Sequence, residues 1–354
     1  MLGRLIKPAY LGARSLFLRV FVHSNRSIPI PGDVRSLVVF TDGRLGDVCL
    51  AIPVLQCLRA TYPDANFAIV LPAHLHSLVQ WSCHPNNVFE HSEKRKVEEF
   101  EWDVAIDLST DYYLKTARLA LQTGARVRIG FEFNGRGAYF THAITEPPLT
   151  EHVQNTYARV LSVLGISFRP IPLPERIPAD VLDEWDPEAV AIHPGAHHPT
   201  QRWPAEYFAE LIREIHGGNQ HCLVLGTSEE RELVTRIVNL AEARATAAIT
   251  NDVLQLAATI RHSQMLICNN SGPLHLAGLL GVPTLSLMGP TVKSRWWPVG
   301  KHAIVLRRND LPCIGCNLAY CKIRTHACMR EVKPEEVFTA YFRLRATLLL
   351  ESST

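Results

Sequence analysis

Short apolar runs alternate with amphipathic stretches along most of the chain. Residues 37–40 are an apolar run typical of a buried strand, and a turn through Gly46 and Asp47 leads into residues 48–60, whose apolar positions recur at helical spacing. Further strands of this first half are expected at 67–71, 104–108 and 127–129. Strands that alternate with helices in this way predict a doubly wound, parallel α/β half.

A proline-rich stretch interrupts the pattern after residue 168. Five prolines stand there: Pro170, Pro172, Pro174, Pro178 and Pro187. Because proline cannot donate to a sheet ladder or sit inside a helix, this stretch is the expected boundary between two domains. The alternation then restarts, with strands expected at 190–193, 222–225, 265–268 and 283–287, and helices beginning near Pro204, Glu229, Asp252 and Gly272.

The fold class that follows is α/β, with two doubly wound, Rossmann-like domains that face a central cleft. Ligands of open α/β sheets bind beyond the carboxyl ends of the strands, so residues that follow strands are the candidates for function. The expected division of the chain is a leader (1–34), a first Rossmann-like domain (35–168), a linker (169–188), a second Rossmann-like domain (189–333) and a C-terminal helix (334–354).

The leader mixes basic and apolar residues. Arg19 interrupts its only apolar core, 16–22, which is far shorter than the roughly 20 apolar residues that span a bilayer, so it fits neither a signal peptide nor a membrane helix. Two interpretations stay open. The leader either contacts anionic lipid through its basic and apolar side chains or packs as a helix on the protein's own surface.

Composition narrows the class of protein. The chain has 354 residues, of which 47% are hydrophobic and 20% charged, as in a folded globular protein. A net charge of +2 gives no sign of the basic domain that nucleic-acid binding needs. Five cysteines that stand singly in apolar surroundings indicate reduced, buried thiols of a cytoplasmic protein: Cys49, Cys57, Cys83, Cys222 and Cys268.

The first candidate for chemistry is Asp47. It stands where a strand meets a helix, so its carboxylate is expected either to cap that helix or to serve as a general base at the cleft. A base must lie within hydrogen-bonding reach of the hydroxyl that it deprotonates, and its position at the cleft distinguishes the two roles.

The second candidate is the segment from Asn269 to His275, between a strand and a helix. The unpaired amides of a helix start, with Gly272 allowing close approach, suit a diphosphate, and Ser271 adds a hydroxyl donor. His275 lies about one turn into the helix, where it either donates to a phosphate oxygen or is a buried structural histidine.

The third candidate is the strand 190–193 with the basic residue Arg202 after it. The guanidinium of Arg202 is permanently charged and binds phosphate oxygens bidentately, whereas Trp203 is expected to pack under the following helix. After the next strand, Glu229 and Glu230 either offer a carboxylate to ribose hydroxyls or cap a helix.

Motifs that the sequence lacks also exclude classes of protein. No G-x-G-x-x-G follows the first strand, and the sequence has no P-loop and no G-x-S-x-G elbow, which speaks against a dehydrogenase, an NTPase or an α/β-hydrolase. No D-x-D stands at a strand end to clamp a metal–diphosphate complex. Neutralisation of charge by helix amides, Arg202 and His275 is therefore the simpler expectation.

A cluster of four cysteines follows the second sheet. Cys313, Cys316, Cys321 and Cys328 are close enough in sequence to bind a structural Zn or Fe ion, and His326 is an alternative ligand. Their spacing is not that of a standard zinc ribbon or finger. Bound metal, reduced thiols and a labile disulfide all stay open for this cluster.

Three segments together resemble the ADP-heptose lipopolysaccharide heptosyltransferases, glycosyltransferase family 9, over about residues 35–340: GRLGDVCLAIPVLQCLRATYPDA, VAIHPGAHHPTQRWPAEYFAELI and ICNNSGPLHLAGLLGVPTLSLMGPT. The resemblance implies a GT-B fold in which 35–168 binds the acceptor and 189–333 binds ADP-heptose. It also implies inverting transfer without a metal cofactor, although some protein-modifying relatives hold iron at the cysteine cluster.

The resemblance assigns roles to individual residues. The base falls on Asp47, and the acid that binds ribose falls on Glu229 or Glu230. The basic residue that binds the donor diphosphate corresponds to Arg202, and the diphosphate-binding helix turn corresponds to Ser271, Gly272 and His275. Asn270 departs from the family pattern, because many members carry Asp there, and asparagine keeps an acceptor oxygen without the charge.

The expected function is heptose transfer to the lipopolysaccharide inner core, in the cytoplasm or on the inner face of the inner membrane, as a step in building the cell envelope. Arg126 and Arg128, with Arg136 and the run 94–96, are candidates to meet anionic groups of that acceptor or are solvated surface residues. Two alternatives stay open: a protein (autotransporter) heptosyltransferase with iron at the cysteines, and a non-catalytic nucleotide-binding relative.

Overall fold

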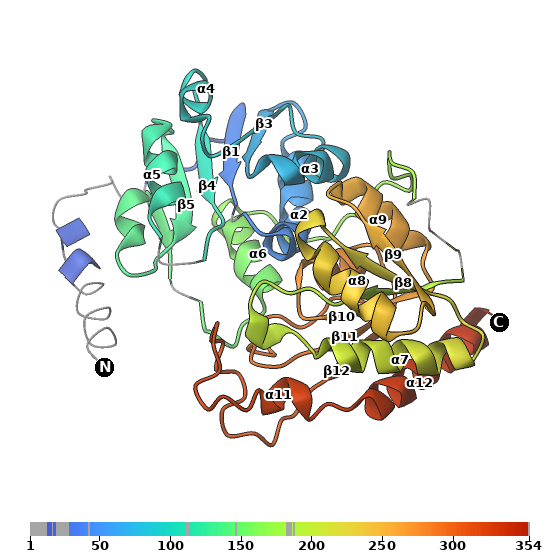
Figure 1. Cartoon of the computed structure of the whole chain (residues 1–354). Coiled ribbons are helices and arrows are strands. Elements are labelled where there is room, and N and C mark those ends of the chain that lie inside the picture. Colours follow the sequence, from blue (N-terminus) through green and yellow to red (C-terminus); the bar gives the residue numbers. More distant parts are fainter. Residues whose placement is uncertain are drawn as a thin grey trace. The chain divides into compact units, whose positions relative to one another are not determined.

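Two compact units make up the chain, Met1–Pro174 and Glu175–Thr354, and the division between them falls inside the proline-rich stretch. The computed structural model describes residues 13–15, 17–18, 28–41, 43–110, 113–145, 147–181, 186 and 188–352. Each unit contains one six-stranded parallel sheet with helices packed on it (Figure 1). The predicted α/β architecture of two Rossmann-like halves is therefore confirmed.

The sheet of the first unit has the order β3-β2-β1-β4-β5-β6. Its strands are β1 (Ser36–Phe40), β2 (Asn66–Val70), β3 (Asn87–Phe89), β4 (Val104–Asp107), β5 (Val127–Phe131) and β6 (His142–Ile144). The central strand β1 is buried along its whole length, as expected for a parallel strand covered on both faces. All neighbouring strands pair in parallel, so their carboxyl ends share one edge.

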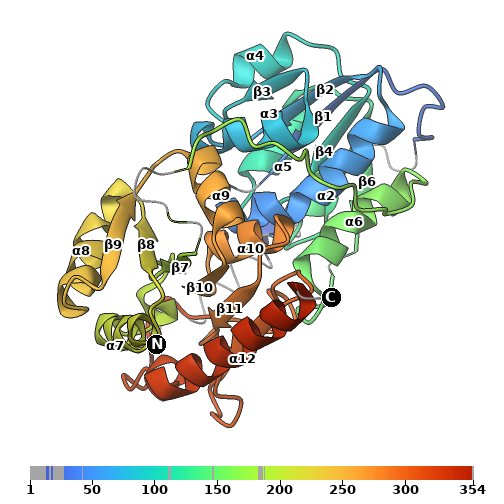
Figure 2. The ribbon, with the colours of Figure 1, turned by 90° about the vertical axis from the view of Figure 1, so that its right-hand side faces the viewer.

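The helices of the first unit cover both faces of this sheet. They are α2 (Leu45–Thr61), α3 (His76–Cys83), α4 (Lys94–Glu98), α5 (Lys115–Gln122) and α6 (Val153–Val163), with 3-10 turns η1 (Ala73–Leu75) and η2 (Arg136–Tyr139). Helices α4 and α5 contribute to one apolar cluster with β1, β2 and β4. Helix α2 contacts both α3 and α6 (Figure 2).

Part of the leader packs on the first unit. Residues 13–15 and 17–18 are helical, Leu18 is buried in the cluster of α4 and α5, and Arg14 donates from a guanidinium nitrogen to the carbonyl of Asn134 at 3.2 Å. Gly135 has a φ of +90°, and a Cβ there would lie 2.7 Å from Cα of Ser15. The described part of the leader thus follows the surface-packed interpretation. Most of residues 1–27 lie outside the described residues.

The sheet of the second unit has the order β12-β11-β10-β7-β8-β9. Its strands are β7 (Val190–His193), β8 (Cys222–Gly226), β9 (Ala245–Ile249), β10 (Met265–Asn269), β11 (Thr284–Leu287) and β12 (Ala303–Leu306). The central strands β10, β7 and β8 pair in parallel, with Cys268 beside His193 and Ile192 beside Val224. This register places the ends of three site-bearing strands next to one another.

Helices cover both faces of the second sheet as well. They are α7 (Ala205–Gly217), α8 (Arg231–Leu240), α9 (Val253–His262), α10 (Gly272–Leu279), α11 (Ala327–Arg330) and α12 (Pro334–Ser352), with 3-10 turns η3 (Pro199–Gln201) and η4 (Ser228–Glu230). One apolar cluster joins α7, α8 and α12 to the sheet, and α7 and α12 lie side by side (Figures 1 and 2). Alternate strand residues outside that cluster, such as Ala191 and Leu266, are also fully buried.

Four strands had no counterpart in the sequence prediction: β3, β6, β9 and β12. All four are the outermost strands of their sheets, and each contains partly exposed residues. An edge strand buries less surface than a central one: β3, β6 and β9 each contain a polar residue, and β12 is apolar but only four residues long. Within the described residues, no helix combines the length and apolarity that crossing a bilayer requires.

Candidate functional site

Asp47 does not cap its helix, contrary to one of the two expected roles. Helix α2 begins at Leu45, its N-cap is Arg44, and Asp47 stands in the first turn. The helix begins earlier than predicted because the turn after β1 is shorter than the polar residues suggested. Asp47 is 7% exposed and belongs to the carboxyl-end edge of the first sheet.

A tyrosine from another helix holds the carboxylate of Asp47. The Tyr157 hydroxyl on α6 donates to Oδ1 of Asp47 at 3.2 Å, and Tyr157 is only 1% exposed. Burial, followed by the negative charge of Asp47, raises the pKa of the neighbouring Cys49 thiol. Sequence reasoning missed Tyr157, because a single tyrosine in an amphipathic helix gives no sign of its tertiary partner.

In the second unit, Asn269 ties together the turns that follow two neighbouring strands. It is the last residue of β10 and is fully buried. Its side-chain oxygen accepts from the amide of Trp203 at 3.0 Å, and its side-chain nitrogen donates to the carbonyl of Pro194 at 2.7 Å. The next residue, Asn270, donates to the carbonyl of Trp296 at 3.2 Å. Both asparagines therefore shape the site through hydrogen bonds.

Helix α10 begins beyond these asparagines, with Ser271 as its N-cap. The Ser271 side chain makes no capping hydrogen bond; its hydroxyl donates to the carbonyl of Asn269 at 3.3 Å. Ser271 and Gly272 are partly exposed, so the start of the helix is open to a ligand. His275 is buried in the helix, and the centroid of its ring lies 5.9 Å from that of Trp296.

Arg202 is exposed, and the amide of the next residue, Trp203, donates to Asn269 at the end of β10, the strand that leads to α10. Nε of Arg202 donates to the carbonyl of Ala196 at 3.1 Å, which anchors the side chain to the turn after β7. Trp203 is buried, donates from its indole nitrogen to the carbonyl of Val332 at 2.8 Å, and meets Phe208 of α7 edge-on. The expectation that Trp203 packs under the helix is confirmed.

Glu229 and Glu230, which the sequence left equivalent, differ in the structure. Glu229 is exposed. Glu230 is partly buried, accepts from the amide of Thr227 at 3.1 Å in a capping box, and lies 3.4 Å from Nε2 of His193. Burial raises the pKa of Glu230, but the His193 and Thr227 contacts outweigh it and lower the pKa to about 2. Glu230 is therefore an ionised carboxylate at the edge of the sheet.

The basic residues proposed for the acceptor have unequal surroundings. Arg126 is exposed. Arg128 is half-buried and donates to two backbone carbonyls, those of Tyr139 at 3.0 Å and Ala125 at 2.7 Å. Arg136 is fully buried and forms an ion pair with the fully buried Asp107 of β4. Arg136 therefore has a structural role, and the expectation that it lies on an acceptor-facing or solvated surface is wrong.

The lysines and arginine of 94–96 lie on the short helix α4. Lys94 pairs with Glu98 at 3.5 Å, and all partners in this helix are at least partly exposed. Such exposed pairs contribute little to stability and match the description of a solvated face.

The four clustered cysteines all carry free thiols. Burial, and then the charges of the other three thiols, raise the pKa of Cys328 to about 11, so the four sulfurs influence one another. Within the described part of the chain, which includes these cysteines, no three His, Cys, Asp or Glu side chains converge as a metal would require. As placed, the thiols do not form a ligand set, and metal binding stays a prediction.

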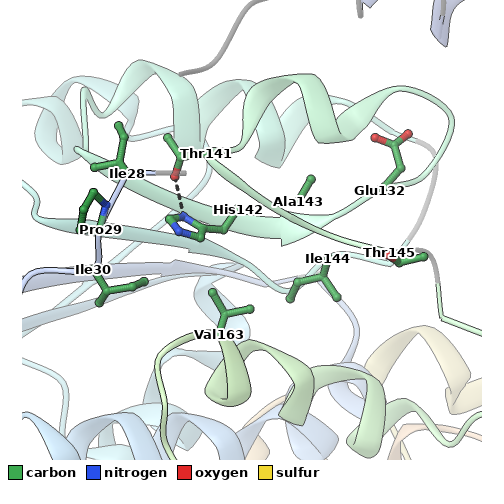
Figure 3. Close-up of a pocket in the computed structure, with 10 residues that line it drawn as sticks. All are labelled: Ile28, Pro29, Ile30, Glu132, Thr141, His142, Ala143, Ile144, Thr145 and Val163. Atoms are coloured by element: carbon green, nitrogen blue, oxygen red, sulfur yellow. Dashed lines mark hydrogen bonds between the residues drawn. The ribbon is translucent and has the colours of Figure 1, made fainter. Parts of the chain in front are cut away.

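A cavity of about 1090 Å³ lies at the edge of the first sheet, beside β6. Figure 3 shows its lining, which includes the apolar side chains of Ile28, Ile30, Ile144 and Val163, while His142 shares a 2.9 Å hydrogen bond with Thr141. None of the predicted site residues lines this cavity.

Two Rossmann-like units, with an open helix start, an exposed arginine and an ionised glutamate at one sheet edge of the second, are features of the GT-B class of glycosyltransferases. A family model described as glycosyltransferase family 9 (heptosyltransferase) matches residues 91–325. The chain belongs to this family and is a glycosyltransferase.

Characterised relatives extend along most of the chain. Lipooligosaccharide heptosyltransferase 2 of Campylobacter jejuni is 23% identical over 317 residues, covering 83% of this chain and 93% of the relative. Lipopolysaccharide heptosyltransferase 1 of Pseudomonas aeruginosa is 27% identical over 332 residues, covering 81% and 87%.

Solved structures show the same fold. ADP-heptose lipopolysaccharide heptosyltransferase II of Escherichia coli superposes with a TM-score of 0.73 at 19% identity, covering 88% of this chain and 99% of that one. The iron-containing dodecameric glycosyltransferase TibC of enterotoxigenic E. coli has a TM-score of 0.59 at 14% identity, covering 89% and 77%.

Proposed function

We propose that this chain transfers heptose from ADP-heptose to the inner core of a lipopolysaccharide precursor, with inversion at the anomeric carbon and without a metal cofactor. The relatives named above act as lipopolysaccharide or lipooligosaccharide heptosyltransferases. The same proposal assigns acceptor binding to residues 35–168 and donor binding to residues 189–333.

The observation that carries the donor half of the proposal is the open start of α10. Ser271 is the N-cap of this helix but its side chain makes no capping hydrogen bond, and both Ser271 and Gly272 are partly exposed. A helix start combines amide donors with a partial positive charge, which is the environment that a diphosphate prefers. Arg202 adds a full positive charge from the adjoining turn.

These groups stabilise the negative charge that a metal ion stabilises in other transferases. Negative charge develops on the diphosphate as the glycosidic bond breaks, and preorganised donors stabilise that charge in the transition state. Ser271, Gly272 and Arg202 meet the diphosphate, with His275 as a further donor from the first turns of α10, and Asn270 holds the turn through its bond to Trp296.

The acceptor half of the proposal depends on Asp47. Its carboxylate takes the proton of an acceptor hydroxyl while that oxygen attacks the anomeric carbon; the bond from this carbon to the diphosphate breaks, and ADP leaves. A general base has to be held in one orientation, and the bond from Tyr157 supplies this constraint. Arg126, exposed on the same unit, is the better candidate of the two arginines to meet an anionic group of the acceptor.

Calorimetric titration of the purified chain with ADP, UDP and GDP, with and without EDTA, tests the donor assignment. The proposal predicts selective binding of ADP that EDTA does not alter. Preference for UDP or GDP, or binding that requires a divalent ion, refutes it. Asp47→Ala is expected to keep the ADP affinity and to lose turnover, which also separates the enzyme from a non-catalytic nucleotide-binding relative.

Because the proposed acceptor is a membrane-borne lipopolysaccharide precursor, we expect the enzyme to work at the cytoplasmic face of the inner membrane. Cell fractionation with a high-salt wash tests this location, because a peripheral protein held by charge is released by salt. Recovery from the periplasmic fraction would contradict the proposal. Protein heptosylation with iron at the cysteines is the less well supported alternative, since the relatives aligned over most of the chain are lipopolysaccharide or lipooligosaccharide heptosyltransferases.

A further inference from the structure

We infer that His193 is a positioning residue for donor recognition: it fixes Glu230 so that the carboxylate oxygen Oε1 receives a ribose hydroxyl of the ADP moiety. The inference rests on the proposed function, because it places the ribose of ADP at Glu230. Four features of the second unit lead to it.

Sheet order brings the two residues together. Strands β7 and β8 are parallel neighbours, so His193, the last residue of β7, and the turn after Gly226 lie at the same edge of the sheet. Nε2 of His193 lies 3.4 Å from Oε2 of Glu230. His193 is only 6% exposed, which excludes rotation of its ring into solvent as its resting state.

The two oxygens of Glu230 have different surroundings. Oε2 receives the amide of Thr227 at 3.1 Å and its hydroxyl at 3.4 Å, in addition to the contact with His193. Among the residues that the structure describes, none donates a hydrogen bond to Oε1. An ionised carboxylate accepts hydrogen bonds at both oxygens, so Oε1 is the oxygen that remains for a ligand hydroxyl.

Gly195 allows the carboxylate of Glu230 to pack closely against the turn after β7. A Cβ at this position would collide with Oε1 of Glu230 and would lie 2.9 Å from Cε1 of His193. The turn that contains Gly195 is held by Asn269, which donates to the carbonyl of Pro194. The backbone of the turn after β7 therefore lies directly against Oε1 and helps to fix the position of the carboxylate.

The second ring nitrogen of His193 indicates how the ring is protonated. Nδ1 is buried and has no hydrogen-bond partner among the described residues. A proton on Nε2 lies on the nitrogen that is 3.4 Å from Oε2 of Glu230, whereas a proton on Nδ1 would be a buried N–H group without a partner among the described residues. In this tautomer the proton of His193 is on the side of Oε2, from which the ring can orient the carboxylate.

The second unit also contains a matched control. His221 lies 3.5 Å from Asp186 through Nδ1, as His193 lies near Glu230, but it directly precedes β8 and therefore belongs to the amino end of the strand. A histidine–carboxylate contact at that end has no access to a ligand bound beyond the carboxyl ends. Substitution of His221 tests the loss of such a contact without change at the donor edge.

The experiment is titration of the full-length chain with ADP, 2′-deoxy-ADP and 3′-deoxy-ADP, which differ only in ribose hydroxyls. A hydroxyl bound to a charged group is worth roughly 10- to 100-fold in affinity. We expect the wild type to prefer ADP to at least one deoxy analogue by tenfold or more. Glu230→Gln and His193→Phe should each reduce that ratio to about threefold or less, and His221→Phe should leave it unchanged.

The ratio of affinities separates positioning from a general loss of structure, because a merely structural defect weakens all three ligands alike. His193→Gln keeps a donor at the position of Nε2 and should restore much of the preference. If His193→Phe does not fold, as judged by circular dichroism, His193→Asn replaces it, since its shorter side chain cannot reach Oε2.

Several outcomes overturn the inference. A wild-type ratio in His193→Phe, with loss of the ratio in Glu230→Gln, refutes the role of His193 and leaves the proposed function intact. A wild-type ratio in Glu230→Gln shows that the ribose is bound elsewhere and also refutes the inference alone. A wild type that does not prefer ADP to UDP and GDP refutes the inference and the proposed function together.

Discussion

Removal of the Arg136 guanidinium should destabilise the first unit strongly. Arg136 and Asp107 are both fully buried and form an ion pair, and Asp107 also accepts from the amide of Ser109 and the hydroxyl of Thr116, both at 3.0 Å. Arg136→Met keeps much of the side-chain volume but leaves a buried carboxylate with neutral donors only. The perturbation is therefore the uncompensated charge of Asp107.

The expected magnitude follows from that charge. Breaking a buried ion pair by removing one partner costs about 3–5 kcal/mol, because the remaining charge has lost its main compensation in a medium of low polarity. The neutral donors of Ser109 and Thr116 favour the lower part of this range. For a unit of this size, about 3 kcal/mol corresponds to a fall of roughly 6–12 °C in Tm.

Urea unfolding followed by hydrogen exchange of peptides from each unit measures this effect. The first unit should unfold at lower urea in Arg136→Met, while the second unit serves as an internal reference. Arg126→Met is the matched surface control and should change the free energy of unfolding by less than about 0.5 kcal/mol. Adding Asp107→Asn to Arg136→Met should recover part of the loss, since it removes the buried charge.

A loss below about 1 kcal/mol in Arg136→Met would refute this reasoning. It would mean that Asp107 is solvated or neutral without its partner. Weaker acceptor binding at unchanged stability would instead return Arg136 to the acceptor-binding role that the sequence suggested.

Three further predictions concern the site. Tyr157→Phe should lower kcat roughly tenfold with little change in donor KM, because it loses the bond that orients Asp47; Tyr341→Phe, at a buried tyrosine in the other unit, is the kinetic control. Gly195→Ala should weaken ADP binding at least tenfold in calorimetry, because the added methyl group displaces Glu230. Glu230 has a depressed pKa, so its stabilising contribution is present above the unfolded value of about 4.3 and is lost as pH falls through about 2. Acid titration followed by circular dichroism measures this loss of stability. In Glu230→Gln the loss of stability at acid pH should be smaller than in the wild type, and an unchanged loss would contradict the assignment.

The sequence predicted the interior of both sheets well and their edges poorly. Central strands such as β1 and β10 are continuous apolar runs, because both of their faces are covered. The edge strands β6 and β12 are short and partly exposed: β6 begins with the polar His142, and β12 is apolar but only four residues long. The hydrophobic pattern of a sequence indicates which residues are buried. An edge strand is defined by its pairing with one neighbouring strand, which this pattern does not show.

The candidate site was predictable where a motif supplies the backbone geometry and not where tertiary pairing decides. The helix start at Ser271 and Gly272 follows from a strand, a polar turn and a glycine in sequence. The contact of His193 with Glu230 depends on the neighbouring order of two strands, which a sequence pattern does not state. Arg136 was expected at the surface and is buried, because the sequence around a charged residue does not show that the fold will place it against a buried ion-pair partner.

The most direct test of the account is turnover with ADP-heptose and a heptose-deficient lipopolysaccharide precursor in the presence of EDTA, with ADP release and the glycosylated product measured together. The account predicts acceptor-dependent transfer that EDTA does not reduce and that Asp47→Asn abolishes while calorimetry still detects ADP binding. Transfer that stops in EDTA, or that persists in Asp47→Asn, would contradict the proposed mechanism.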